Sequence, residues 1–138
     1  MYLLGNIEGK ETPELIECVD LFIKAGLLLN AEENSGHTAL TLAVSKGFSE
    51  ISQNLLKFGA SPDQQVKGNF NNTSLHLAVQ QNNIPLIKIL LQFKPNLLLK
   101  NDLNSNPVDD AISNPNSEIY RILAEESNKR SDNISQED

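Results

Sequence analysis

The chain has 138 residues, the length of one domain, with 39% hydrophobic residues and a formal net charge of −7 at pH 7. Nucleic acids and anionic membranes are bound through clustered Lys and Arg, so the acidic balance and the 11 scattered basic residues argue against both as partners. No stretch of the sequence approaches the roughly eighteen apolar residues of a membrane-spanning helix.

The first region with helical spacing of apolar residues is 14–30 (ELIECVDLFIKAGLLLN). It contains Cys18, the single cysteine of the chain, which excludes an intramolecular disulfide and suits a reducing compartment. Aliphatic residues occupy the same place in later segments, so we expect Cys18 to be a buried, unreactive thiol. Residues 1–10 lack the pattern. Either they form an irregular cap or the chain is part of a longer array, the alternative that we favour.

The two central segments, 36–60 and 71–95, repeat one another. In each, Thr, a small residue, Leu and then Leu-Ala-Val recur in order, and an aliphatic residue follows eight positions after the Ala. Fixed self-similarity at this length is typical of stacked supersecondary units. Each segment is expected to form two short helices, with Gly47 or Asn82 ending the first of them. The expected helices span residues 38–46, 49–58, 73–81 and 84–93.

A weaker copy of the pattern runs from 102 to 124, where Asp110 replaces an apolar residue and Pro115 replaces a glycine between the helices. A terminal unit has one face without a neighbour, so polar substitution there suits a cap. From Glu125 onward the regularly spaced apolar residues stop. Residues 125–138 are therefore expected to be a disordered tail, because such a sequence cannot offset its ordering entropy.

The sequence carries no phosphate-binding glycine-rich loop and no His or Cys pair at metal-ligand spacing. Asp109 and Asp110 follow Pro107, which marks a helix start, so we interpret them as capping residues rather than as paired catalytic carboxylates. An enzyme would need convergent titratable groups, and neither His37 nor His76 lies beside a credible nucleophile. We expect no catalytic residue, no cofactor, no metal site and no enzymatic activity.

The repeated motif resembles that of the ankyrin repeat family. It occurs at residues 36–44 (GHTALTLAV) and 71–79 (NNTSLHLAV), and in degenerate form at 104–112 (NSNPVDDAI). The resemblance implies an all-α fold, an ankyrin-type α-solenoid of paired antiparallel helices with projecting hairpin loops. It also implies that the motif histidine, His76, bonds loop backbone and links neighbouring turns. The implied ankyrin domain covers residues 1–124, in approximate units 1–33, 34–68, 69–101 and 102–124.

The resemblance further implies where a protein partner would bind. In ankyrin-like stacks, the loops project as fingers and, with the first helices, form a concave strip of variable positions. Phe70 and Leu103 occupy equivalent finger positions, so together they would make an apolar anchor. Alternatively, Phe70 folds back onto its own loop. The candidate partner-binding residues are His37, Ser45, Lys46, Phe70, Asn72, Gln80, Gln81, Leu103 and Ser105.

These implications favour a non-catalytic protein–protein interaction module, which we expect to be a cytoplasmic monomer with a protein partner. One alternative is a substrate-recruiting ankyrin segment of a larger enzyme. Another is a segment of a secreted bacterial effector that acts in the host cytosol. That alternative rests only on a composition rich in Asn, Ile and Lys.

Overall fold

The computed structural model describes residues 9–25, 30–32, 34–114 and 117–136. Within these residues the chain forms helices and loops, with one isolated antiparallel bridge between Val66 and Asn72. The all-α fold expected from the sequence is confirmed. The helices are α2 (Pro13–Lys24), α3 (Ala39–Ser45), α4 (Ser49–Lys57), α5 (Ser74–Gln80), α6 (Ile84–Leu91), α7 (Pro107–Ile112) and α8 (Ser117–Gln136).

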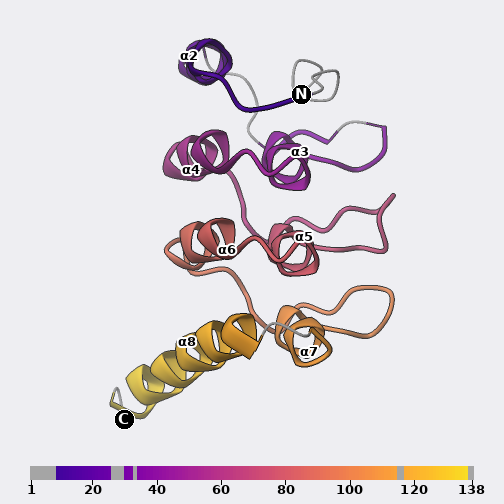
Figure 1. Cartoon of the computed structure of the whole chain (residues 1–138), viewed down its shortest axis with the longest axis vertical. Coiled ribbons are helices and arrows are strands. Elements are labelled where there is room, and N and C mark those ends of the chain that lie inside the picture. Colours follow the sequence, from indigo (N-terminus) through magenta and orange to yellow (C-terminus); the bar gives the residue numbers. More distant parts are fainter. Residues whose placement is uncertain (1–8, 26–29, 33, 115–116, 137–138) are drawn as a thin grey trace.

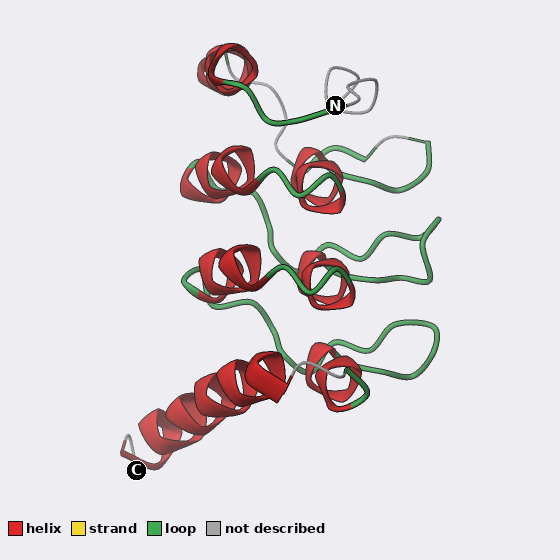
Figure 2. Ribbon diagram, in the orientation of Figure 1, coloured by secondary structure: helices red, strands yellow, loops and turns green. Residues whose placement is uncertain are grey.

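The helices stand in two rows (Figure 1). One row contains α3, α5 and α7, and the other contains α2, α4, α6 and α8. Successive helices of a row pack on one another, as α3 does on α5 and α4 on α6. The loops that lead into α3, α5 and α7 all project from the first row on the same side (Figure 2). The pairs α3–α4, α5–α6 and α7–α8 are therefore successive units of a solenoid.

Each helix of the first row begins at a capping box, in which the N-cap and N3 side chains accept each other's backbone N–H. In α5 the Thr73 hydroxyl accepts the His76 N–H at 3.3 Å, and His76 Nδ1 accepts the Thr73 N–H at 3.1 Å. Polar residues recur at these two motif positions because the same local hydrogen bonds start each helix. The capping pairs are Thr38 with Thr41, Thr73 with His76, and Asn106 with Asp109.

The ends of α3 and α5 lie where the sequence predicted them. Gly47 follows α3 with φ +75°, and Asn82 follows α5 with φ +56°, so both adopt the left-handed conformation. The turn after α3 is closed by a hydrogen bond from the Phe48 N–H to the Ala43 carbonyl at 2.9 Å. This pattern reverses the chain within a few residues and delivers it to the second row.

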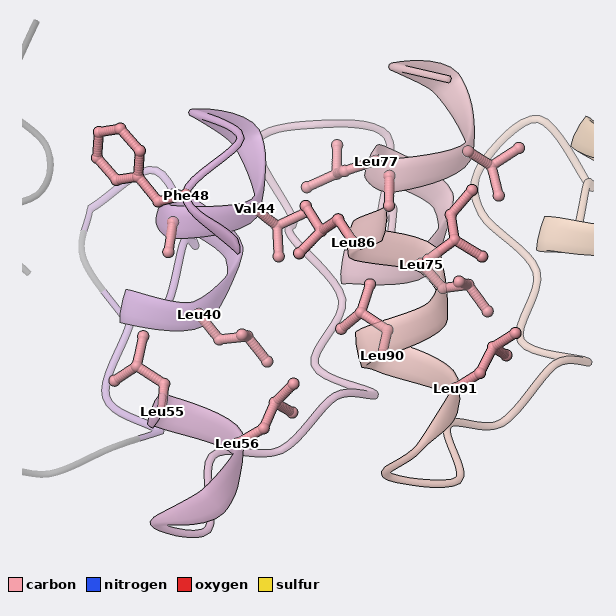
Figure 3. Close-up of a cluster of buried hydrophobic side chains, with 14 of the residues drawn as sticks. Leu40, Val44, Phe48, Leu55, Leu56, Leu75, Leu77, Leu86, Leu90 and Leu91 are labelled. Carbon is pink, nitrogen blue, oxygen red and sulfur yellow. The ribbon is translucent and has the colours of Figure 1, made fainter. Parts of the chain in front are cut away.

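The core consists of aliphatic side chains buried between units. Val44 and Leu56 of one unit point toward Leu86 and Leu90 of the next (Figure 3). All four are at most 4% exposed. The aliphatic residues at helical spacing on α4, α6 and α8 form an apolar stripe that lies in this core. Its members are Leu56, Leu90, Leu91 and Leu123.

The N-terminus of α4 is capped from the preceding unit. Its own N-cap residue, Phe48, makes no side-chain capping bond. Instead, the Glu11 carboxylate accepts the Ile51 N–H at 2.6 Å and the Glu50 N–H at 3.3 Å. A carboxylate at this position also interacts favourably with the positive end of the helix dipole. The segment before α2 is thus joined to α4 by a specific polar contact as well as by apolar packing.

The expectation of a buried Cys18 is wrong, because the residue is half-buried. Cys18 corresponds to Leu86, which points back toward the preceding unit (Figure 3). Since α2 is the first described helix, the matching side of α2 has no described helix packed on it. Val19, on the side of α2 that meets α4, is the buried residue of this helix.

The expectation of a disordered tail from 125 is wrong for 125–136, which continue α8. The helix is anchored in the core by Ile119 and Leu123, so adding turns avoids the cost of nucleation. Glu126 pairs with Arg130 at 3.3 Å one turn later and with Lys94 at 3.7 Å. Arg130 also donates to the Pro95 carbonyl. Polar contacts therefore hold the helix where the apolar pattern has ended; residues 137–138 lie outside the described residues.

Replacing Leu90 with Ala should lower the free energy of unfolding by about 2–5 kcal/mol, because it leaves a cavity between two units. Chemical denaturation of the variant and the parent protein measures the difference. Lys88→Ala on the exposed face of the same helix is the matched control and should change stability little. An unchanged denaturation midpoint for Leu90→Ala would contradict the assigned core.

Candidate partner-binding surface

Neighbouring finger loops are joined along their backbones. The Ser35 carbonyl accepts the Gly68 N–H at 3.1 Å, and the Phe70 carbonyl accepts the Asp102 N–H at 2.8 Å. Ser35 and Phe70 precede the motif by the same offset, so equivalent carbonyls bond the following finger in both places. The fingers are therefore a connected edge rather than separate loops.

Amide side chains add further hydrogen bonds between the finger that leads into α5 (the third) and the finger that leads into α7 (the fourth). Asn71 donates to Asp102 Oδ1 at 2.8 Å, and Asn101 donates to Asn72 Oδ1 at 2.8 Å. Gln65 donates to the Lys100 carbonyl at 2.9 Å. Each bond connects residues about one repeat apart, which fixes the spacing between these two fingers.

His76 links two units through both of its ring nitrogens. Nε2 lies 2.8 Å from the Ser105 carbonyl, which can only accept, so Nε2 carries the hydrogen. Nδ1 is then the acceptor for the Thr73 N–H. The ring is fully buried, and the predicted role of bonding loop backbone and linking neighbouring turns is confirmed. At the equivalent positions, Thr41 and Asp109 close the capping boxes of their own units.

Two glycines permit the close approach of the finger that leads into α3 (the second) and the finger that leads into α5 (the third). A Cβ atom on Gly68 would overlap the Ser35 carbonyl oxygen. Gly36 has φ +87°, and a Cβ there would lie 2.9 Å from the Lys67 nitrogen. Gly68 thus has a steric role that the motif does not reveal, because the contact is with a residue one unit away.

The apolar finger tips are exposed. Phe70 is 59% exposed and Leu103 is 69% exposed. The alternative in which Phe70 packs onto its own loop does not fit this exposure. The hydrogen bond between the Phe70 carbonyl and the Asp102 N–H places the two tips on backbones that are directly paired. The structure therefore brings these two predicted residues to adjacent positions on one edge.

The remaining predicted strip residues differ in accessibility. Ser45, Gln80 and Gln81 are exposed, whereas His37, Lys46 and Ser105 are half-buried. The expectation for Asn72 is wrong: it is 3% exposed, because its side chain accepts the Asn101 amide. Asn72 consequently holds two fingers together and is inaccessible to a partner.

Gln80 and Gln81 connect first-row helices as well as facing solvent. Gln80 donates to Asp110 Oδ2 at 3.1 Å, and Gln81 donates to the Ser45 carbonyl at 3.0 Å. Asp110 also accepts the Ser105 hydroxyl at 2.5 Å. Asp110 lies in the first turn of α7, as expected for an acidic residue at a helix start, and it also links two units. Its polar side chain at an apolar motif position was the sequence signal for this role.

The described residues offer no grouping that suggests catalysis. They contain no cluster of three His, Cys, Asp or Glu side chains able to hold a metal ion. A hollow of about 280 Å³ between α7 and α8 is lined by Ala111, Ile112, Asn114 and Tyr120. This lining has no adjacent acid and base, so the hollow lacks the convergent titratable groups of an active site. In the same part of the chain, none of the helices combines the length and the apolar character needed to cross a bilayer.

Replacing Gly68 with Ala should lower the free energy of unfolding by about 1–3 kcal/mol, because the added methyl group forces the fingers apart. Thermal or chemical denaturation measures the loss. Lys67→Ala, at the exposed neighbouring position, is the control and should be nearly neutral. A Gly68→Ala protein as stable as the parent would contradict the close approach of these fingers.

Comparison with known proteins finds the same repeat along most of the chain. A family model of three ankyrin repeat copies matches residues 53–136, and a model of a single ankyrin repeat matches residues 35–67. Protein glp-1 of Caenorhabditis elegans is 33% identical over 109 residues, which is 76% of this chain. Ankyrin repeat and SOCS box protein 11 of Mus musculus is 28% identical over 107 residues, or 78% of this chain. The matched regions span 8% and 32% of those two relatives, respectively.

Proposed function

Because the chain belongs to the ankyrin repeat family, whose members are generally protein–protein interaction modules, we propose that it binds a protein partner through its finger tips and first-row helices. The observation that carries this proposal is the pair of exposed apolar tips, Phe70 and Leu103, on hydrogen-bonded neighbouring fingers. Large apolar side chains at the centre of an interface supply most of the binding energy.

The rigidity of the fingers supports the proposal. Backbone bonds from Gly68 to Ser35 and from Asp102 to Phe70 hold the fingers in place before a partner arrives. Binding to an ordered surface loses less conformational entropy than binding to a mobile one. The two tips are therefore prepared to receive a partner without rearrangement.

Polar and acidic groups beside the tips set the chemistry of the partner. The exposed Ser45, Gln80 and Gln81 offer adaptable hydrogen bonds, and Asp102 is an exposed acid next to Leu103. With a net charge of −7, the chain attracts basic segments over a distance. We accordingly propose a partner segment that carries apolar side chains flanked by Lys or Arg.

A second candidate is that these repeats recruit a partner or substrate for a longer protein. It is supported by the relatives, of which this chain spans only 8% and 32%. A place within a secreted effector and a cytoplasmic location are further proposals, supported only by composition and by the lone cysteine. In each case the binding surface would be the same.

Replacing both Phe70 and Leu103 with Ser should weaken partner binding by about 2 kcal/mol or more while leaving stability nearly unchanged. The partner is first identified by affinity capture from the source cell, then produced pure and titrated by calorimetry. Phe58→Ser, which removes a 47% exposed aromatic at the end of α4, is the control and should bind normally.

Unchanged affinity in the double variant would contradict the anchor at the finger tips. Substitution of Lys46, Gln80 and Gln81 would then test the first-row helices. If neither set of substitutions affects binding, the proposed surface is wrong.

A further inference from the structure

Each helix pair in the stack has one side that meets the preceding unit and one that meets the next. Val44 and Leu56 point forward, toward Leu86 and Leu90, which point back (Figure 3). Corresponding residues lie 33 positions apart, except between the second and third units, where the longer loop makes the offset 35. This register shows which side of the first and last helices would meet a further unit.

The forward side of the last unit is apolar and open. Ile112 corresponds to Val44 and Val79, both fully buried, yet it is 63% exposed. Tyr120 corresponds to Ile87, also fully buried, and is 43% exposed. The hollow of about 280 Å³ lies between these two side chains. In a repeat stack, an apolar side of this kind is buried by packing against a neighbouring helix pair.

The backward side of α2 likewise has no described helix packed on it. Phe22 corresponds to Leu55 and Leu90, which are at most 1% exposed, yet Phe22 is 46% exposed. Val19, on the forward side of the same helix, is buried where α2 meets α4. The α2 helix therefore exposes a large apolar side chain at a position where the corresponding side chains of later units are buried against the preceding unit.

We propose that copies of this chain associate head to tail, with the α7–α8 end of one copy packed against α2 of the next. The contact would continue the interface between units that the chain already forms within itself, with Phe22 of one copy meeting Ile112 and Tyr120 of another. A second copy is the fitting occupant because the two open ends are the two halves of that one interface. This inference departs from the monomer expected from the sequence.

The proposed contact is heterologous, joining two different surfaces, so it does not close at a dimer. Both ends belong to a chain of net charge −7, so copies repel one another at low ionic strength. Salt screens such repulsion between exposed charges. Association should therefore grow with protein concentration and with salt.

Sedimentation velocity of the full chain, from micromolar to millimolar concentration at low and high salt, tests the proposal. The average mass should rise steadily with concentration, and more steeply at high salt. A chain that remains monomeric at millimolar concentration in high salt would overturn the proposal.

Two single variants test the direction of the contact. Phe22→Glu blocks the α2 end and Ile112→Glu blocks the α7–α8 end, so each should be monomeric alone. An equimolar mixture should form dimers and nothing larger, because each variant keeps one intact end. Leu98→Glu, which adds the same charge at a 73% exposed residue after α6, should associate like the parent chain.

Dimers of Phe22→Glu alone would show pairing between two α7–α8 ends and would overturn the head-to-tail contact. A mixture of the two variants that stays monomeric would overturn it too. So would an Ile112→Glu variant that associates as strongly as the parent chain. Circular dichroism verifies that each variant is folded. Tyr120→Glu replaces Ile112→Glu at the same end if that variant unfolds.

Discussion

The stacking of helix pairs is the constraint on which the rest of this structure depends. A pair such as α5–α6 has apolar side chains on two opposite sides, and it can bury both only by lying between two other pairs. Leu86 and Leu90 face the preceding unit, while Leu91 lies on the side of the next one (Figure 3). Stability in such a protein comes from contacts between neighbours, not from one closed core.

The stacking of the helices does not by itself hold the long loops in one arrangement. The fingers solve this by bonding one another, through the Ser35 and Phe70 carbonyls, and by burying amides such as Asn72 and Asn101 in mutual contact. His76 adds a bond from a first-row helix to the next finger. Buried polar groups are tolerated when they are hydrogen-bonded, and here the same bonds make the outer edge rigid.

Apolar stacking between helix pairs and hydrogen bonding between fingers leave different surfaces of the molecule exposed. Along the stack, the apolar sides of the helix pairs are buried against neighbouring units, and the fingers and first-row helices form the surface that we propose for a partner. Phe70 and Leu103 are exposed apolar residues of the fingers. At the two ends, the stacking surfaces themselves remain open, as Phe22, Ile112 and Tyr120 show. Partner binding and self-association would thus use different faces and need not compete.

Much of the fold could be predicted from the sequence, because its signals are local or periodic. Helix starts follow from capping residues such as Thr38 and Thr73, helix ends from Gly47 and Asn82, and the core from aliphatic spacing. The equivalence of the Phe70 and Leu103 finger positions also followed from the repeat length. Each of these features depends on residues within one unit and on the repeat length.

Tertiary structure alone decided the features that depend on contacts between units. Asparagine is usually a surface residue, but Asn72 is buried because Asn101, one repeat later, donates a hydrogen bond to its side chain. The polar sequence after Glu125 has no regularly spaced apolar residues, yet it is helical through residue 136. Glu126 pairs there with Arg130 and Lys94, and Arg130 donates to the Pro95 carbonyl. The sequence by itself determined the unit and its period, because backbone preference and apolar spacing act over a few residues. Which polar side chains bridge units, and which surfaces stay open, depended on distances that exist only once the units are stacked.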